Sequence, residues 1–111
     1  MNHGNLYEAS EPAGTEERFD TLLQHRNLVV ERIISSKNTP PVEFIQDQDE
    51  WVLLVHGTAI LEVSGQAKAL KAGDYLFLPA KTPHTVRAVS DGALWLAVHL
   101  HPTQLPRDRR V

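Results

Sequence analysis

Apolar residues near the start of the chain are spaced as on one face of a helix. Phe19, Leu22 and Leu23 stand at positions i, i+3 and i+4, which is the helical period. Thr15 precedes them as a candidate N-cap, and the two glutamates that follow it suit the positive end of a helix dipole. This pattern predicts a short helix over residues 15–25.

The rest of the chain has the pattern of short strands separated by turns. Runs of β-branched and aromatic residues end at turn sequences such as SGQ, KAGD and SDG. Gly57 stands between two such runs and predicts a tight hairpin. We count about eight short strands and no long helix after residue 26, which predicts an all-β sandwich or barrel. The clearest runs are NLVVERIIS, EWVLLV, TAILEV, AKAL, YLFLP, HTVRAV and LWLAVHLH.

One of these strands is apolar on both faces. Because successive side chains point to opposite sides of a strand, Trp51, Leu53 and Val55 share one face. Val52 and Leu54 share the other face. A strand that is apolar on both sides belongs in a layered structure. The outer face should therefore be covered by the N-terminal helix or by a second copy of the chain, and we expect a homodimer.

Composition and charge exclude several classes of protein. The chain has 111 residues, which suits one domain, and its net charge of -3 provides no basic field for nucleic acid. It contains no cysteine, which excludes disulfides and thiolate chemistry and fits a reducing compartment. The first residues do not resemble a signal peptide, and no apolar run is long enough to cross a bilayer. We therefore expect a cytoplasmic protein without nucleic-acid or membrane partners.

Composition also divides the chain into three parts. A polar arm and the short helix take residues 1–26, a β-barrel takes residues 27–102, and a polar tail takes residues 103–111. All the residues that we select as candidates for chemistry lie in the middle part.

Four polar residues stand where the strand pattern directs side chains toward a barrel interior. Glu50 and His84 each open an apolar strand, and His99 shares a face of the last strand with Trp95. Gln46 lies just before the strand that Glu50 opens. If these strands line one barrel, the four side chains converge on one cavity. Imidazole and carboxylate suit zinc, iron, manganese, nickel or copper, whereas an amide oxygen is a weaker ligand.

Each of these residues also has a purely structural interpretation. A single histidine on a strand is more often a hydrogen-bonded structural residue than a metal ligand. Glu50 can be a solvated residue at the rim, and the QDQDE run can be a solvated acidic loop. The spacing leaves both interpretations open. The apolar walls of the predicted pocket are Phe44, Val52, Leu54, Val86 and Trp95.

The order of turns and polar residues resembles the cupin superfamily. Glu50 and Gly57 match the end of its first motif, and Gly73, Pro79 and His84 match its second motif. The resemblance covers roughly residues 28–101 and implies an antiparallel double-stranded β-helix, also called a jelly-roll barrel. The chain also looks like a functionally uncharacterised subgroup of small bacterial cupins with the pattern QDxDEW, GDYLxxPA, H and WLAxH.

The chain departs from the family pattern at the metal ligands. Phe44 and Gln46 stand where the first motif has its two histidines. The ligand set that the resemblance implies is therefore reduced to Glu50 and His84, with Gln46 as a substitute. His99 lies outside both motifs and is our candidate for a further ligand.

Three functions remain open. The first is a metal-dependent oxygenase, decarboxylase or isomerase, in which Glu50 and His84 would be the catalytic residues and Glu50 would act as a ligand or a general base. The second is a metal-free barrel that binds or senses a small molecule without catalysis. The third is a structural or interaction role with a degenerate pocket.

Overall fold

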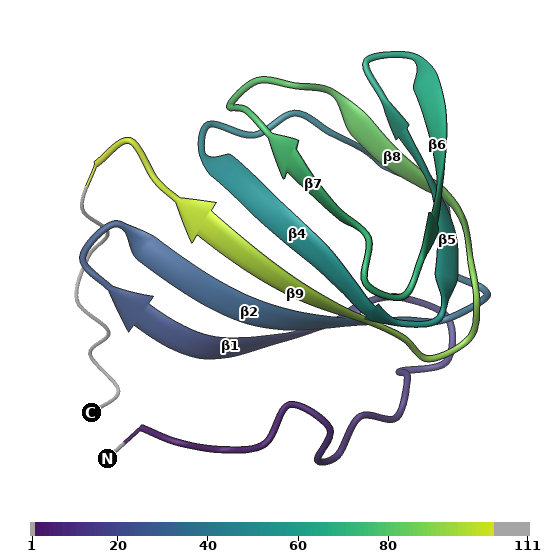
Figure 1. The fold of residues 1–111 in the computed structure, drawn as a ribbon, viewed down its shortest axis with the longest axis horizontal. Coiled ribbons are helices and arrows are strands. Elements are labelled where there is room, and N and C mark those ends of the chain that lie inside the picture. Colours follow the sequence, from purple (N-terminus) through teal and green to yellow (C-terminus); the bar gives the residue numbers. More distant parts are fainter. Residues whose placement is uncertain (1, 104–111) are drawn as a thin grey trace.

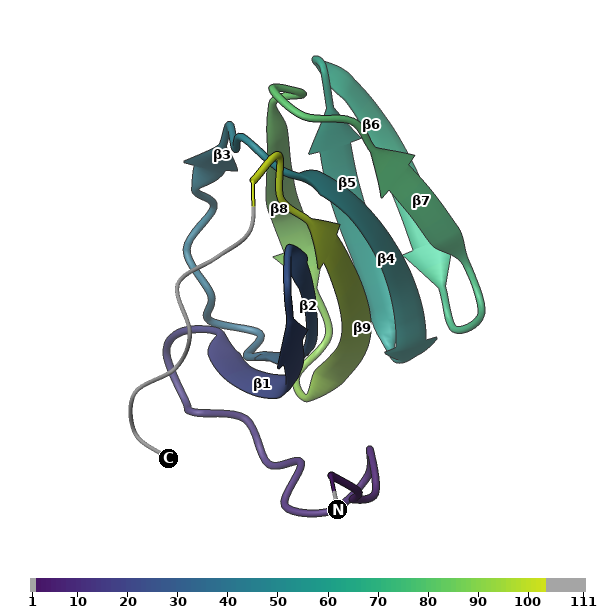
Figure 2. The same ribbon diagram turned by 90° about the vertical axis from the view of Figure 1, so that its left-hand side faces the viewer.

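Two antiparallel sheets face each other in the computed structural model, which describes residues 2–103 (Figures 1 and 2). The five-stranded sheet has the order β1-β2-β9-β4-β7, and the four-stranded sheet has the order β3-β8-β5-β6. This architecture is the predicted all-β jelly roll. The strands are β1 Arg18–His25, β2 Leu28–Ser35, β3 Glu43–Phe44, β4 Asp49–His56, β5 Thr58–Val63, β6 Gln66–Lys71, β7 Tyr75–Leu78, β8 His84–Val89 and β9 Ala93–Leu100.

Most connections carry the chain from one sheet to the other. The predicted hairpin at Gly57 is wrong, because β4 pairs with β7 and β9 while β5 pairs with β6 and β8. Gly57 has a φ of +96° and instead turns the chain between the two sheets. The SGQ turn is a true hairpin within one sheet, and it joins β5 to β6 with positive φ at Ser64 and Gly65. A chain that switches sheets at its corners brings distant strands together, and this positions the site.

The predicted helix over residues 15–25 is wrong, since residues 18–25 form the edge strand β1. β1 pairs with β2, and its register shifts between Thr21 and Leu23. A β-bulge of this kind inserts one residue and breaks the period of two. The interruption places Phe19, Leu22 and Leu23 at a helix-like spacing in a strand, which explains why the pattern was misleading.

The N-terminal arm lies against the outer side of β1 and β2. Arg32 is buried and donates hydrogen bonds to the carboxylate of Asp20, at 2.6 and 2.9 Å, and to the backbone oxygens of Leu6 and Glu8. Arg18 binds the backbone oxygen of Ala9 at 2.6 Å. Two arginines of the sheet thus hold the arm in place. Apart from Thr103, the predicted polar tail lies outside the described residues.

The hydrophobic core fills the space between the two sheets. Its members come from both layers, and most of them are aliphatic or small. They are Ile33, Val52, Leu54, Ala59, Leu61, Leu70, Leu78, Ala93, Trp95 and Ala97. Within the described part of the chain, no helix has the length and apolar character needed to span a membrane.

Candidate functional site

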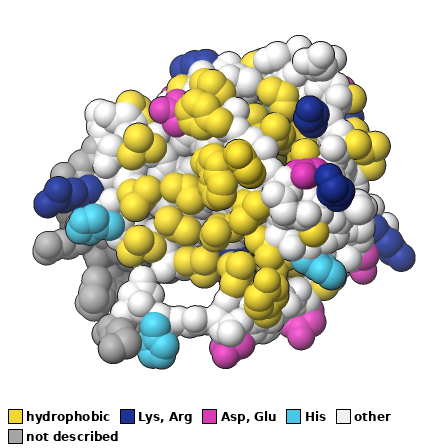
Figure 3. Space-filling model, in the orientation of Figure 1, with side chains coloured by type: hydrophobic (Ala, Val, Ile, Leu, Met, Phe, Trp, Pro, Cys, Tyr) yellow, Lys and Arg dark blue, Asp and Glu magenta, His cyan; other side chains and the backbone are white. Residues whose placement is uncertain are grey.

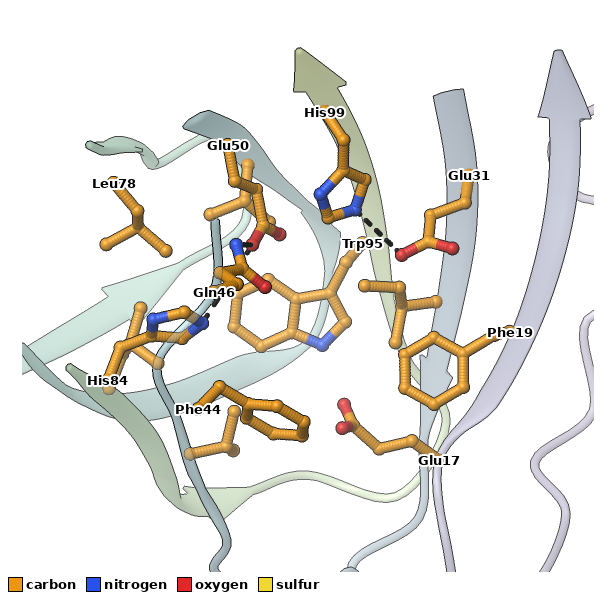
Figure 4. A pocket seen from close by; sticks show the side chains of 14 residues that line it. Glu17, Phe19, Glu31, Phe44, Gln46, Glu50, Leu78, His84, Trp95 and His99 are labelled. Atoms are coloured by element: carbon orange, nitrogen blue, oxygen red, sulfur yellow. Dashed lines mark hydrogen bonds and ion pairs between the residues drawn. The ribbon is translucent and has the colours of Figure 1, made fainter. Parts of the chain in front are cut away.

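The polar residues of the site occupy the inner face at one end of the sandwich. Alternation along β4 points Glu50, Val52 and Leu54 inward, and all three are buried. Glu50 lies directly opposite His99 on the neighbouring strand β9. His84 opens β8 in the other sheet. The three side chains therefore reach the interior from two facing sheets (Figure 4).

These side chains border a cavity of about 80 Å³. Pockets for drug-sized ligands are roughly 300–1,000 Å³, so this cavity suits a small molecule. Both polar and aromatic residues surround it. The lining consists of Glu17, Phe19, Glu31, Ile33, Phe44, Gln46, Glu50, Val52, Leu61, Leu78, His84, Val86, Trp95 and His99.

Glu50, His84 and Gln46 form one polar group in this cavity. Gln46 donates its side-chain amide to Oε1 of Glu50 at 2.7 Å. Nε2 of His84 lies 3.9 Å from the same oxygen, beyond hydrogen-bond reach. Nδ1 of His84 is 3.1 Å from the backbone oxygen of Thr82, and the ring stacks on Phe44 with centroids 5.8 Å apart. The backbone and the aromatic ring hold this imidazole with Nε2 toward the cavity.

His99 belongs to a second polar group. Its Nε2 is 2.8 Å from Oε1 of Glu31, and its Nδ1 is 3.3 Å from the side-chain nitrogen of Gln48. Burial by itself lowers the pKa of His99, but the hydrogen bond to Glu31 and the negative charges of Glu50 and Glu31 outweigh it. The pKa of His99 is therefore raised above its ordinary value, and Glu31 is the main cause.

A third carboxylate closes the cavity on the side of β1. The indole nitrogen of Trp95 donates to the hydroxyl of Ser35 at 3.0 Å, and that hydroxyl donates to Glu17 at 3.1 Å. Burial raises the pKa of the Glu17 carboxyl, and the charges of Glu50 and Glu31 raise it further, against the lowering effect of Ser35. Glu17 thus favours its neutral form more than an exposed glutamate does.

The cavity borders a second hollow at the surface. Both are lined by Glu17, Phe19, Phe44 and Val86. The outer hollow adds Glu16, Thr39, Pro40 and Val42. Its lining comes from the region between β1 and β3, which are the edge strands of the two sheets on that side. The cavity therefore adjoins the surface on the side of these two edge strands.

The structure brings the four polar residues selected from the sequence to one cavity. Gln46, Glu50, His84 and His99 all line it. Among the five predicted wall residues, Leu54 is fully buried in the hydrophobic core and does not line the cavity. The other four, Phe44, Val52, Val86 and Trp95, do line it.

Sequence reasoning missed several residues of the site. Glu31 carried a usable signal, because it interrupts the β-branched run NLVVERIIS much as Glu50 opens an apolar strand. Glu17 and Phe19 lie in the segment for which the sequence predicts a helix, so the strand alternation that directs side chains inward did not identify them. Gln48 had no signal beyond its place in the QDQDE run, and its contact with His99 depends on tertiary structure.

The four predicted ligands do not fit a complete metal centre in this arrangement. Residues 2–103 contain no group of three or more His, Cys, Asp or Glu side chains placed to hold a metal ion. Nε2 of His99 faces Glu31, and Gln46 presents its amide N–H to Glu50. An amide N–H is a donor and does not coordinate a metal. Only Glu50 and His84 remain as strong ligands that face each other.

Comparison with known proteins confirms the resemblance. The model of the cupin domain family matches residues 34–102, and the chain belongs to the cupin family. No curated protein matches the chain.

Solved structures share the same fold. A candidate mannose-6-phosphate isomerase from Ralstonia eutropha is 37% identical, with a TM-score of 0.78 over 91% of this chain and 99% of that chain. The TT1209 protein of Thermus thermophilus is 18% identical, with a TM-score of 0.77 over 91% and 98%. KdgF from Halomonas sp. is 16% identical, with a TM-score of 0.72 over 91% and 89%. The last two show the fold alone.

Proposed function

We propose that the chain binds a small polar organic molecule in the cavity between its sheets, and that Glu50 and His84 contact it. One observation carries this proposal. Glu50 and His84 are only 6% and 9% exposed, and both present polar atoms to the same cavity from opposite sheets. Gln46 and the backbone of Thr82 each satisfy one polar atom of this pair, and Nε2 of His84 and the second oxygen of Glu50 have no such partner among the described residues. A bound molecule would contact these two remaining atoms.

The same pair supports proton-transfer chemistry on the bound molecule. Oxygens of Glu50 and Nε2 of His84 are the groups within the cavity best placed to accept a proton from it. Glu50 is the candidate general base, because a buried carboxylate beside a reacting carbon can take its proton. Isomerisation by proton transfer is one reaction that needs such a step, and the Ralstonia eutropha neighbour is a candidate isomerase.

Metal-dependent chemistry is a second candidate. Oε1 of Glu50 and Nε2 of His84 approach within 3.9 Å from two sheets, which is close to the separation of two ligands that share one ion. A third ligand would have to come from the side-chain oxygen of Gln46 or from the substrate itself. The metals that suit this set are zinc, iron, manganese, nickel and copper.

The indole N–H resonances of the two tryptophans test the binding proposal. Trp95 lines the cavity, whereas Trp51 lies on the outer face of the sheet and serves as an internal reference. A panel of amines, hydroxy acids, polyols and sugars is titrated into ¹⁵N-labelled protein. We expect at least one compound to shift the Trp95 signal but not that of Trp51, and to bind less tightly to His84→Gln.

His56→Gln is the matched control, because His56 is an exposed histidine at a corner between the sheets. It should bind as the wild type does. If no compound shifted Trp95, or if His84→Gln and His56→Gln bound equally well, the proposal would be wrong.

We also propose that the chain forms a homodimer through the outer face of the five-stranded sheet. Figure 3 shows hydrophobic side chains gathered across this face. Tyr75 and Phe77 on β7 are 65% and 60% exposed, and the partly buried Trp51 and Leu53 on β4 lie opposite them in the register. Large contiguous apolar patches are rare on monomers and mark interaction surfaces.

A further inference from the structure

The lining of the cavity is acidic. Its ionisable residues are the carboxylates of Glu17, Glu31 and Glu50 and the imidazoles of His84 and His99. With Glu31 and Glu50 ionised and both imidazoles neutral, the lining is negative, and an ionised Glu17 would add to that charge. Among the lining residues within 2–103, none is lysine or arginine.

Basic residues close to the site in sequence are engaged elsewhere. Arg32 follows Glu31, but it lies on the other face of β2, where it binds Asp20 and the N-terminal arm. Lys81 lies in the loop before His84, and its ammonium pairs with Asp47 at the surface. Neither cation lines the cavity, so neither can balance an anion bound there.

The free polar atoms of the central pair are acceptors. The backbone oxygen of Thr82 can only accept a hydrogen bond, so Nδ1 of His84 carries the proton in the contact between them. In the neutral ring, Nε2 is then an acceptor. It has no hydrogen-bond partner among the described residues, since Glu50 is 3.9 Å away. The His84 side chain is about nine-tenths buried, and no buried side-chain polar atom of residues 2–103 lacks a partner, so Nε2 is open to the cavity, where it can accept a hydrogen bond from a donor on the ligand.

Aromatic rings enclose the same space. Phe19, Phe44 and Trp95 line the cavity, and Figure 4 shows their rings around it together with the carboxylates of Glu17, Glu31 and Glu50. The faces of aromatic rings attract cations, most strongly where water is excluded. Rings and carboxylates together therefore suit a molecule that has an apolar body and a positive charge.

We infer that the cavity takes a small organic cation of the alkylammonium type and rejects anions, phosphorylated sugars included. The inference rests on the proposed function, because it names the class of molecule that the proposed site binds. An ammonium would donate hydrogen bonds to Glu50 and to Nε2 of His84, and its carbon atoms would lie against the rings. A phosphate or carboxylate would stand beside buried carboxylates with no lysine or arginine in the lining and with Nε2 of His99 already paired with Glu31, which is strongly unfavourable.

Three compounds with one branched carbon skeleton isolate the effect of charge. They are isobutylammonium, isobutanol and isobutyrate, titrated at neutral pH and constant ionic strength with the Trp95 indole N–H as the reporter and Trp51 as the reference. We expect isobutylammonium to bind about tenfold more tightly than isobutyrate, because opposite charges attract in a desolvated site and like charges repel. Isobutanol should lie between them.

The outcomes separate this inference from the proposed function. If isobutyrate bound as tightly as isobutylammonium, or more tightly, the cation preference would be wrong while a small-molecule site remained. If none of the three compounds and no member of the wider panel shifted Trp95, the proposed function would fail, and this inference with it.

Two variants test whether the preference for cations over anions comes from the cavity. Glu50→Gln keeps the shape of the side chain and removes its charge, so the ratio of the two affinities should fall toward one. Glu43→Gln removes an exposed carboxylate that does not line the cavity, and it should keep the wild-type ratio. Equal loss in both variants would trace the effect to overall charge and overturn the inference.

Discussion

Oε1 of Glu50 and Nε2 of His84 lie 3.9 Å apart, although one is the second residue of β4 and the other is the first residue of β8 in the facing sheet. The distance exceeds that of a hydrogen bond, and Gln46 already donates to the same oxygen. The pair is thus held near contact by two independent sheets, and it is the centre of the proposed site.

This geometry predicts weak metal binding. Two strong ligands rarely hold a transition metal tightly, so dialysis against a chelator should remove any zinc, iron, manganese, nickel or copper. Elemental analysis before and after dialysis measures this, and His84→Ala should abolish whatever binding remains. One ion per chain that survived the chelator would contradict the prediction and make the metal-dependent candidate the leading one.

Gly57 should tolerate no side chain. Its φ is +96°, and an added Cβ would lie 2.6 Å from Oγ of Ser90 and 3.0 Å from Cβ of Ala93. An unfavourable backbone conformation alone costs about 1–3 kcal/mol. We expect Gly57→Val to lower the free energy of unfolding by more than this, because the steric clash adds to the backbone strain. Urea denaturation measures the loss. Gly73→Ala is the control, because Gly73 has a φ of +95° and open space at its Cβ position. An equal loss of stability in this variant would show that the steric clash at Gly57 is not the cause.

The contact of Asp20 with Arg32 should make stability depend on pH. Burial alone would raise the pKa of Asp20, but hydrogen bonds from Arg32 and Arg18 outweigh it and hold the pKa below its ordinary value. The stabilisation is then present above the unfolded pKa of about 4 and is lost as the pH falls through the folded value. Asp20→Asn should lower the free energy of unfolding by about 1–3 kcal/mol at pH 7 and by less at pH 3. A difference that did not depend on pH would refute this account.

Glu17 should make the stability of the protein depend on pH in the opposite direction. Its pKa is raised in the folded state, so the neutral carboxyl is favoured and stability declines as the pH rises through the folded value. Glu17→Gln keeps an acceptor for Ser35 and cannot ionise. We expect it to raise the melting temperature at pH 7.5 and to change it little at pH 4. Exposed Glu43→Gln serves as the control and should show no such dependence, and an unchanged melting temperature of Glu17→Gln at pH 7.5 would count against the raised pKa.

A charge on the outer face of the five-stranded sheet should separate the proposed dimer. Phe77 is 60% exposed, so Phe77→Glu should leave the fold intact while it places a charge in the apolar contact. Light scattering after size exclusion should then show a dimer for the wild type and a monomer for the variant. Ile60→Glu alters an exposed apolar residue of the other sheet and should remain dimeric. A wild-type monomer would rule out the interface.

The sequence alone was sufficient to predict the fold class and the inward direction of several polar side chains. Alternation along a strand and glycine at corners are local properties, so the strand runs and the spacing of Gly73, Pro79 and His84 could be read directly. The inward direction of Glu50 followed from the same alternation. These predictions needed no knowledge of which strands pair.

The tertiary structure decided everything that depends on pairing. The bulge in β1 produced the helix-like spacing of Phe19, Leu22 and Leu23, and only the partner strand β2 shows it to be a strand. Gly57 looked like a hairpin because a turn between sheets needs the same positive φ as a turn within one. His99 turns to Glu31 and not to Glu50, its partner in the register, because β2 brings a second carboxylate within 2.8 Å. Local patterns set the direction of each side chain, but only long-range strand pairing sets which charges meet.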